Sequence, residues 1–150
     1  MLQAINLARE GMLKGRGGPF GCVIVKGEEI IGKGSNEVLS TFDPTAHAEI
    51  VAIRNACLTL NHFQLDDCEV YTSCEPCPMC LGALYWARVK KVVYANTRYD
   101  AAAIEFDDDF IYQEINASFM QRQIPFIHLP HAEALAVFKE WQEMEDKLKY

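Results

Sequence analysis

The 150-residue sequence lacks any apolar run near the length of about 20 residues that a membrane-spanning helix requires. Its start also lacks the basic segment, apolar stretch and small-residue cleavage site of an export signal. Basic residues are scarce, because 14 Lys and Arg stand against 21 Asp and Glu, a formal net charge of -7. Since proteins hold long polyanions through Lys and Arg, this balance favours a small uncharged ligand over a nucleic acid. We expect a cytoplasmic protein with no membrane partner.

No internal repeat and no low-complexity linker divides the chain either. Its length, with half of the residues hydrophobic, suits one ordinary domain with a single core. Patterns typical of strands alternate with patterns typical of helices, which predicts an α/β fold with a central sheet covered by helices. The segments expected to be extended are 20–25, 29–34, 70–72, 92–95 and, as a short edge strand, 125–129. The segments expected to be helical are 2–13, one that begins near 47, 77–87 and 131–149.

Residues that can bind a metal ion gather at the starts of two of the predicted helices. His47 and Glu49 fall in the first turn of one helix, and Cys77 and Cys80 are three residues apart at the start of the other. That spacing puts both sulfurs on one side of a helix, whose positive end favours thiolates. Three ligands leave a fourth position on zinc for water, which the ion acidifies. We predict a catalytic Zn²⁺ site of His47, Cys77 and Cys80, with Glu49 as proton carrier.

Cys74 leaves a structural alternative open. It stands three residues before Cys77, so a site with three cysteines and one histidine is conceivable. Four protein ligands would exclude water and give Glu49 no task. A further alternative is a buried histidine near unrelated thiols, with Glu49 as an ordinary surface residue at a helix start.

The pattern His-x-Glu followed by Pro-Cys-x-x-Cys is the signature of zinc-dependent nucleobase deaminases. Over nearly all of its length, the chain resembles the bacterial guanine deaminases of the cytidine deaminase-like fold. The motifs that carry this resemblance are residues 17–21, 43–49, 71–83, 85–88 and 106–108, together with the terminal Tyr150.

The resemblance implies a three-layer α-β-α fold with a central mixed five-stranded sheet and one Zn²⁺ per subunit. It also implies a homodimer whose C-terminal segment, residues 131–150, crosses to the active site of the partner subunit, where Tyr150 would close the pocket. The reaction implied is hydrolytic attack on C2 of guanine, which yields xanthine and ammonia in purine catabolism or salvage.

The resemblance gives roles to further residues. Glu49 would act as general base and then as general acid, and Asp108 would carry a second proton to the leaving amino group. Asp108 is equally one of three acidic residues in a solvated turn by pattern alone. Asn36 would bind the purine edge, since an amide both donates and accepts hydrogen bonds, although it also suits a turn.

Aromatic residues and backbone groups complete the predicted pocket. Phe20 and Trp86 would enclose the base, although either ring could belong to the core. The backbone amides of Ala48 and Cys77 would contact the substrate and the attacking oxygen.

Several other functions compete with guanine deamination. Within the enzyme class these are the deamination of guanosine, of triazine-like analogues, or of adenosine in transfer RNA, and the negative charge disfavours the last. A catalytically silent zinc module is the alternative from a different class, and the intact Glu49 argues against it.

Overall fold

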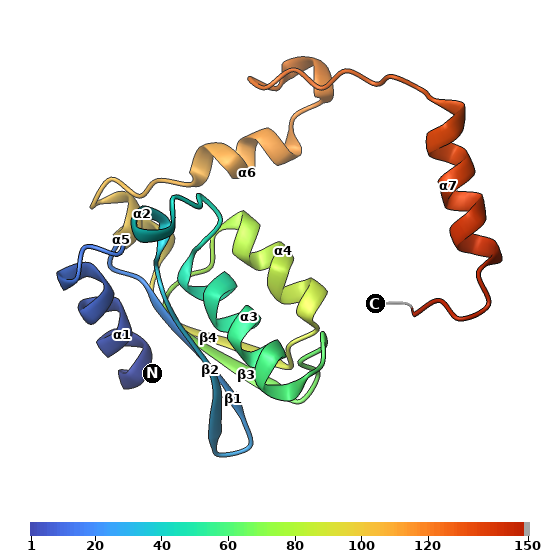
Figure 1. Cartoon of the computed structure of the whole chain (residues 1–150). Helices are drawn as coiled ribbons and strands as arrows, with labels where there is room; N and C mark the ends of the chain where they lie inside the picture. The colour runs from blue at the N-terminus through green and yellow to red at the C-terminus, as the bar shows by residue number, and fades with distance from the viewer. Residues whose placement is uncertain (149–150) are drawn as a thin grey trace. The chain divides into compact units, whose positions relative to one another are not determined.

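The computed structural model describes residues 1–148 and divides the chain into two compact units, Met1–Phe110 and Ile111–Tyr150. The first unit contains the whole sheet and the helices that pack on it (Figure 1). In chain order, its elements are α1 Leu2–Leu13, β1 Gly21–Lys26, β2 Glu29–Ser35, α2 Val38–Thr41, α3 Ala48–Leu60, β3 Cys68–Cys74, α4 Pro78–Ala87, β4 Lys91–Asn96 and α5 Arg98–Ala102.

The sheet is mixed and has the strand order β2-β1-β3-β4. The pairs β1–β2 and β1–β3 are antiparallel, whereas β3 and β4 are parallel and are connected through α4. The predicted extended segments 20–25 and 29–34 are confirmed as strands and form a hairpin around Gly27, which has the positive φ of 61° that a tight turn favours. Helices α3 and α4 cover one face of the sheet and α1 covers the other, which confirms the three-layer α/β prediction (Figure 1).

Small residues let α3 lie unusually close to the sheet. Its buried stripe is Ala48, Ala52 and Ala56, one residue per helical turn. A Cβ atom added to Gly34 of β2 would lie 2.2 Å from the carbonyl oxygen of Ala48. No side chain fits in that space, so the position of the start of α3 is set by direct contact with β2. The two residues that begin the predicted metal motif, His47 and Ala48, are placed by this contact.

The second unit contains short helices that bury little. Helix α6, Asp109–Asn116, begins at the end of the first unit, and the 3-10 helix η1, Phe119–Gln121, and α7, Ala132–Glu143, follow. Apolar side chains of α7, among them Leu135, Val137 and Phe138, are exposed.

Two expectations for this part of the chain are wrong. The described residues form four strands and not five, because 125–129 has no regular secondary structure and pairs with no strand. A strand is formed only where backbone groups pair with those of another strand, and 125–129 makes no such pairing among the described residues. The last helix ends at Glu143 and not at 149, and the Lys147 ammonium group donates to the carbonyl oxygen of Met144 at 2.8 Å, just past that end. Across residues 1–148, no helix has the length and apolar character to cross a membrane.

Candidate active site

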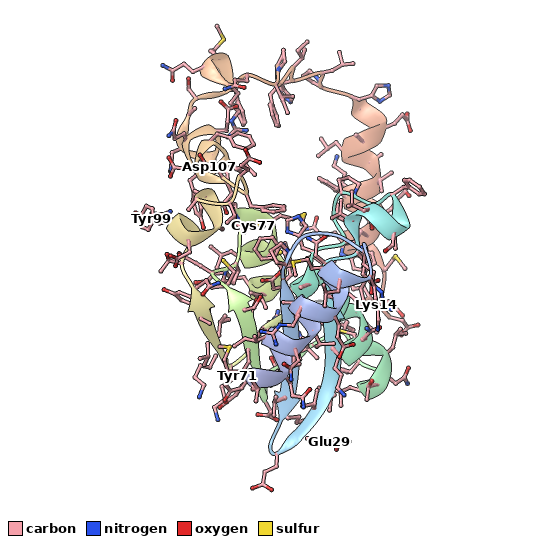
Figure 2. All side chains as sticks on the ribbon, turned by 90° about the vertical axis from the view of Figure 1, so that its left-hand side faces the viewer. Lys14, Glu29, Tyr71, Cys77, Tyr99 and Asp107 are labelled. Atoms are coloured by element: carbon pink, nitrogen blue, oxygen red, sulfur yellow. The ribbon has the colours of Figure 1, made fainter. Side chains whose placement is uncertain are left out.

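The starts of α3 and α4 meet at one end of the sheet. His47 is the residue just before α3, Cys77 is the residue just before α4, and Cys80 lies in the first turn of α4. Both preceding residues have extended backbone, and neither uses its side chain to cap its helix. Pro78 at the first position of α4 is preorganised for a helix start. The imidazole and the thiol are therefore available for a shared ligand. Figure 2 shows Cys77 at the end of the sheet opposite the hairpin that carries Glu29.

The donor atoms of these residues are spaced as zinc requires. Nδ1 of His47 lies 3.5 Å from Sγ of Cys77 and 3.6 Å from Sγ of Cys80. Among the described residues, these three side chains form a group whose ligand atoms lie within 4.8 Å of one another. A tetrahedral zinc ion with bonds of about 2.0 Å to nitrogen and 2.3 Å to sulfur separates the two atoms by about 3.5 Å. The residues present therefore fit Zn²⁺, and mixed nitrogen and thiolate donors favour this metal.

The electrostatics of the site favour a thiolate even without the metal. Hydrogen bonds from the Cys80 thiol and from His47 lower the pKa of Cys77 to about 4. The pKa of Cys80 is raised, first by its hydrogen bond to Cys77 and then by burial. The pKa of His47 is also raised, chiefly by its hydrogen bond to Cys77. One of the two sulfurs is thus an anion at neutral pH, which is the form that binds metal.

Glu49 lies in the first turn of α3 with 5% of its surface exposed. Oε1 of its carboxylate accepts a hydrogen bond of 2.7 Å from the hydroxyl of Thr72 on β3, which is fully buried. Burial raises the pKa of Glu49, and the Thr72 hydrogen bond opposes that rise. Thr72 was not among the residues singled out from the sequence, although a polar residue in a strand predicted to be buried is a signal that could have found it.

Cys74 does not join the metal group. Its thiol is buried at the end of β3 and donates to the carbonyl oxygen of Thr97 at 3.5 Å. Burial raises its pKa to about 11, so this sulfur is a neutral thiol at physiological pH. The structure therefore brings together three ligands from the motif and leaves Cys74 outside, against the four-ligand alternative.

Asn36 follows β2 and is also buried. Its Oδ1 accepts hydrogen bonds from the backbone N–H groups of Gly18 and Val38, each at 3.3 Å. Because the amide oxygen is held by the backbone, the amide nitrogen is the group that Asn36 offers to a ligand. The glycine-rich turn at residues 15–18 therefore helps to determine the orientation of the amide, through the N–H group of Gly18.

Asp108 lies two residues after Phe106, which contacts Phe20. The ring of Phe106 contacts that of Phe20 edge to face, with centroids 5.0 Å apart. This contact holds the segment that carries Asp108 against the glycine-rich turn, where Gly18 has no room for a Cβ atom. Asp108 is half-buried, and burial followed by the nearby Cys77 raises its pKa. Figure 2 shows the neighbouring Asp107 at the same end of the sheet as Cys77.

The remaining predicted residues are placed differently. Ala48 is fully buried at the first position of α3, so its backbone N–H points out of the helix start. Trp86 is exposed near the far end of α4, about 14 Å along the helix axis from Cys77 at 1.5 Å per residue. The structure does not bring this ring to the metal group of its own chain. Tyr150 lies outside the described residues.

Comparisons with known proteins agree with this geometry. Residues 1–96 match the family model for the cytidine and deoxycytidylate deaminase zinc-binding region. The chain is 54% identical to the guanine deaminase of Bacillus subtilis (strain 168) over 148 residues, which are 99% of this chain and 95% of that protein. A crystal structure of guanine deaminase from Bacillus subtilis superposes with a TM-score of 0.97 and covers the same shares of the two chains.

Other relatives match a smaller part of the chain. The solved guanine deaminase from Nitrosomonas europaea is 34% identical with a TM-score of 0.66, covering 70% of this chain and 61% of that one. The tRNA-specific adenosine deaminase of Aquifex aeolicus is 46% identical over 92 residues, 61% of this chain and 60% of that protein. The likeness to the Bacillus subtilis enzyme, unlike these two, extends through the C-terminal segment.

Proposed function

Because the chain belongs to the zinc-dependent cytidine and deoxycytidylate deaminase family, and within it to the guanine deaminases, we propose that it deaminates guanine to xanthine and ammonia. The observation that carries this proposal is the group of His47, Cys77 and Cys80 beside the buried carboxylate of Glu49. Three ligands leave zinc one position for the water that such a hydrolysis consumes. A metal that only joined two helices would need no buried carboxylate beside it.

Zinc supplies the reaction with a water molecule acidified towards neutral pH. Glu49 takes the proton from the attacking water and delivers it to a ring nitrogen of the base, a role that contributes about 10²- to 10⁴-fold in rate. Its anchored Oε1 leaves Oε2 as the oxygen that moves the proton. Burial excludes bulk water from this transfer.

Asn36, Ala48 and Phe20 hold the purine. The amide nitrogen of Asn36 donates to an acceptor on the edge of the base, since its oxygen is held by the turn. The backbone N–H groups of Ala48 and Cys77 lie at helix starts, where the positive ends of two dipoles favour developing negative charge. The half-buried ring of Phe20 forms an apolar wall.

Asp108 carries the second proton, from the hydroxyl group at C2, which becomes the carbonyl group of xanthine, to the departing amino group. The amino group must be protonated before it leaves C2 as ammonia, and the raised pKa of Asp108 keeps its acid form to higher pH than a free aspartate allows. The contact between Phe106 and Phe20, which holds the segment that carries Asp108 against Gly18, supports this role.

The protein works as a homodimer in which residues 131–150 of each subunit cross to the partner's site. The exposed apolar side chains Leu135, Val137 and Phe138 of α7 support a partner surface for this helix. In this arrangement, Tyr150 and Trp86 complete the pocket between two subunits. All six cysteines are free, which suits a reducing compartment and hence the cytoplasm.

Replacement of Glu49 by Gln tests the function. The amide keeps the shape of the side chain but cannot take up a proton, so turnover of guanine should fall by about 10²-fold or more while zinc content and folding stay unchanged. Glu29→Gln, at the opposite end of the sheet, is the matched control and should turn over guanine normally (Figure 2). Full activity in Glu49→Gln would overturn the proposed role, and loss of folding would favour a structural zinc module.

Mixed dimers test the exchange of the C-terminal segment. Glu49→Gln has an inactive pocket and an intact tail, whereas Tyr150→Ala has an intact pocket and an altered tail. If the tails cross, co-expression of the two inactive variants should restore about a quarter of the wild-type activity, since half of the dimers are mixed and each mixed dimer has one complete site. No recovery would show that each tail serves its own chain.

A further inference from the structure

We propose that Thr72 is a positioning residue for Glu49, whose buried hydroxyl holds one carboxylate oxygen so that the other carries the proton in both steps. Thr72 acts through Glu49, whose Oε1 accepts the hydrogen bond of the Thr72 hydroxyl. Since Glu49 as proton carrier belongs to the proposed function, this inference rests on that function.

The strand position of Thr72 makes it a rigid donor. It lies in the middle of β3, paired with Cys22 of β1 on one side and with Tyr94 of β4 on the other. Its backbone is therefore fixed by two neighbouring strands. As a β-branched residue, threonine also has restricted rotation about χ1. The hydroxyl has few alternatives to the orientation in which it meets Glu49.

Thr72 is a fully buried polar residue on a strand that contributes to the hydrophobic core. Successive side chains of a strand alternate between faces, so Thr72 shares its face with Val70, which belongs to the hydrophobic core. Packing alone would favour another apolar side chain at this fully buried position, because a hydroxyl without a partner is costly there. The hydroxyl is satisfied by Oε1 of Glu49 at 2.7 Å, 23 residues earlier in the chain.

The hydrogen bond gives the two carboxylate oxygens of Glu49 different roles, because it anchors Oε1 and leaves Oε2 to carry the proton. An ionised carboxylate only accepts hydrogen bonds, so the Thr72 hydroxyl is the donor of the hydrogen bond to Oε1. The buried Glu49 side chain is thus held at its carboxylate by a donor on a neighbouring strand, two residues along the chain from the metal ligand His47. The other carboxylate oxygen, Oε2, can then both receive a proton from water and release it to the base without rotation of the side chain. Positioning of this kind accelerates a reaction because the reacting groups are already in place.

Variants at position 72 separate positioning from packing. Thr72→Val removes the hydroxyl at nearly constant volume and should lower kcat for guanine by about 10- to 100-fold, the range expected for a lost hydrogen bond to a charged group. KM and zinc content should not change. Thr72→Ser keeps the hydroxyl and should restore most of kcat. Ser73→Ala removes the neighbouring buried hydroxyl, which accepts from the Gly21 N–H and not from Glu49, and should keep kcat.

A second pair of variants tests the same inference if Thr72→Val fails to fold. Thr72→Ala and Thr72→Ser leave similar space and differ only in the hydroxyl, so the alanine variant should show the same loss of kcat relative to the serine variant. Proton NMR of the zinc-loaded protein gives a readout that does not depend on turnover. The hydroxyl proton of Thr72 should exchange slowly, shift in Glu49→Gln and be absent in Thr72→Val.

Three results would overturn the inference while leaving the proposed function intact. They are wild-type kcat in Thr72→Val, a loss that Thr72→Ser does not restore, and a hydroxyl resonance that Glu49→Gln leaves unchanged. If the wild-type protein were inert on guanine, the proposed function would fail, and the role of Thr72 in it would fail too.

Discussion

Gly17 lies so close to Asn36 that a Cβ atom at position 17 would be 2.0 Å from Oδ1 of the asparagine amide. The glycine-rich turn therefore shapes the site directly, since only a residue without a side chain allows the amide to accept the N–H groups of Gly18 and Val38. The turn thus holds the buried amide of Asn36 in one orientation.

Gly17→Ala should displace Asn36 and weaken guanine binding. Loss of a hydrogen bond to the base should raise KM by about 10-fold, with zinc content unchanged. Steady-state kinetics against guanine measure this. Gly82→Ala is the matched control, because nothing lies within 4 Å of a Cβ atom there and alanine favours helix α4, so the free energy of unfolding should stay equal or rise by up to about 1 kcal/mol. An unchanged KM in Gly17→Ala would show that Asn36 does not contact the base.

Replacement of single cysteines should separate the ligands from their neighbour. Cys77→Ala and Cys80→Ala each remove a ligand and should reduce zinc content from one ion per chain to near zero after dialysis. Cys74→Ala should keep the full zinc content, because its thiol bonds to the Thr97 carbonyl group. Metal analysis of the purified variants decides this. Zinc loss in Cys74→Ala, with folding intact, would support the alternative site with four protein ligands.

Asp100 should stabilise the protein in a pH-dependent way. It forms a capping box with Thr97 at the start of α5, and hydrogen bonds from the Thr97 side chain and then its backbone lower the pKa of Asp100 below its usual 3.8. The stabilisation is present above the pKa of the unfolded chain and is lost as pH falls through the lower folded value. Asp100→Ala should therefore be less stable than wild type at pH 7, with the difference shrinking in strong acid. A gap in stability that is constant with pH, in denaturant titrations, would contradict this.

Local patterns predicted most of the first unit. The strands on either side of Gly27 and the helix starts at His47 and Cys77 depend on residues close in sequence, and each is found where it was expected. The metal group could be predicted for the same reason, since two short motifs at helix starts contain all three ligands.

Contacts between residues that are distant in the sequence could not be predicted from local patterns. The bond between Thr72 and Glu49 and the contact between Phe106 and Phe20 depend on how the strands pair, which periodicity does not report. The strand expected at 125–129 failed for a related reason. A segment becomes a strand only when another strand pairs with it, and no strand among the described residues pairs with this one.

Turnover of a substrate panel by the zinc-loaded protein tests the central claim most directly. Guanine, guanosine, adenine, cytosine and a transfer RNA anticodon stem would be followed by ultraviolet absorbance and ammonia release. We expect guanine to be converted to xanthine rapidly and the others slowly or not at all. Preference for guanosine or RNA would contradict the assignment of the free base as substrate, and silence on all five substrates would contradict the enzyme itself.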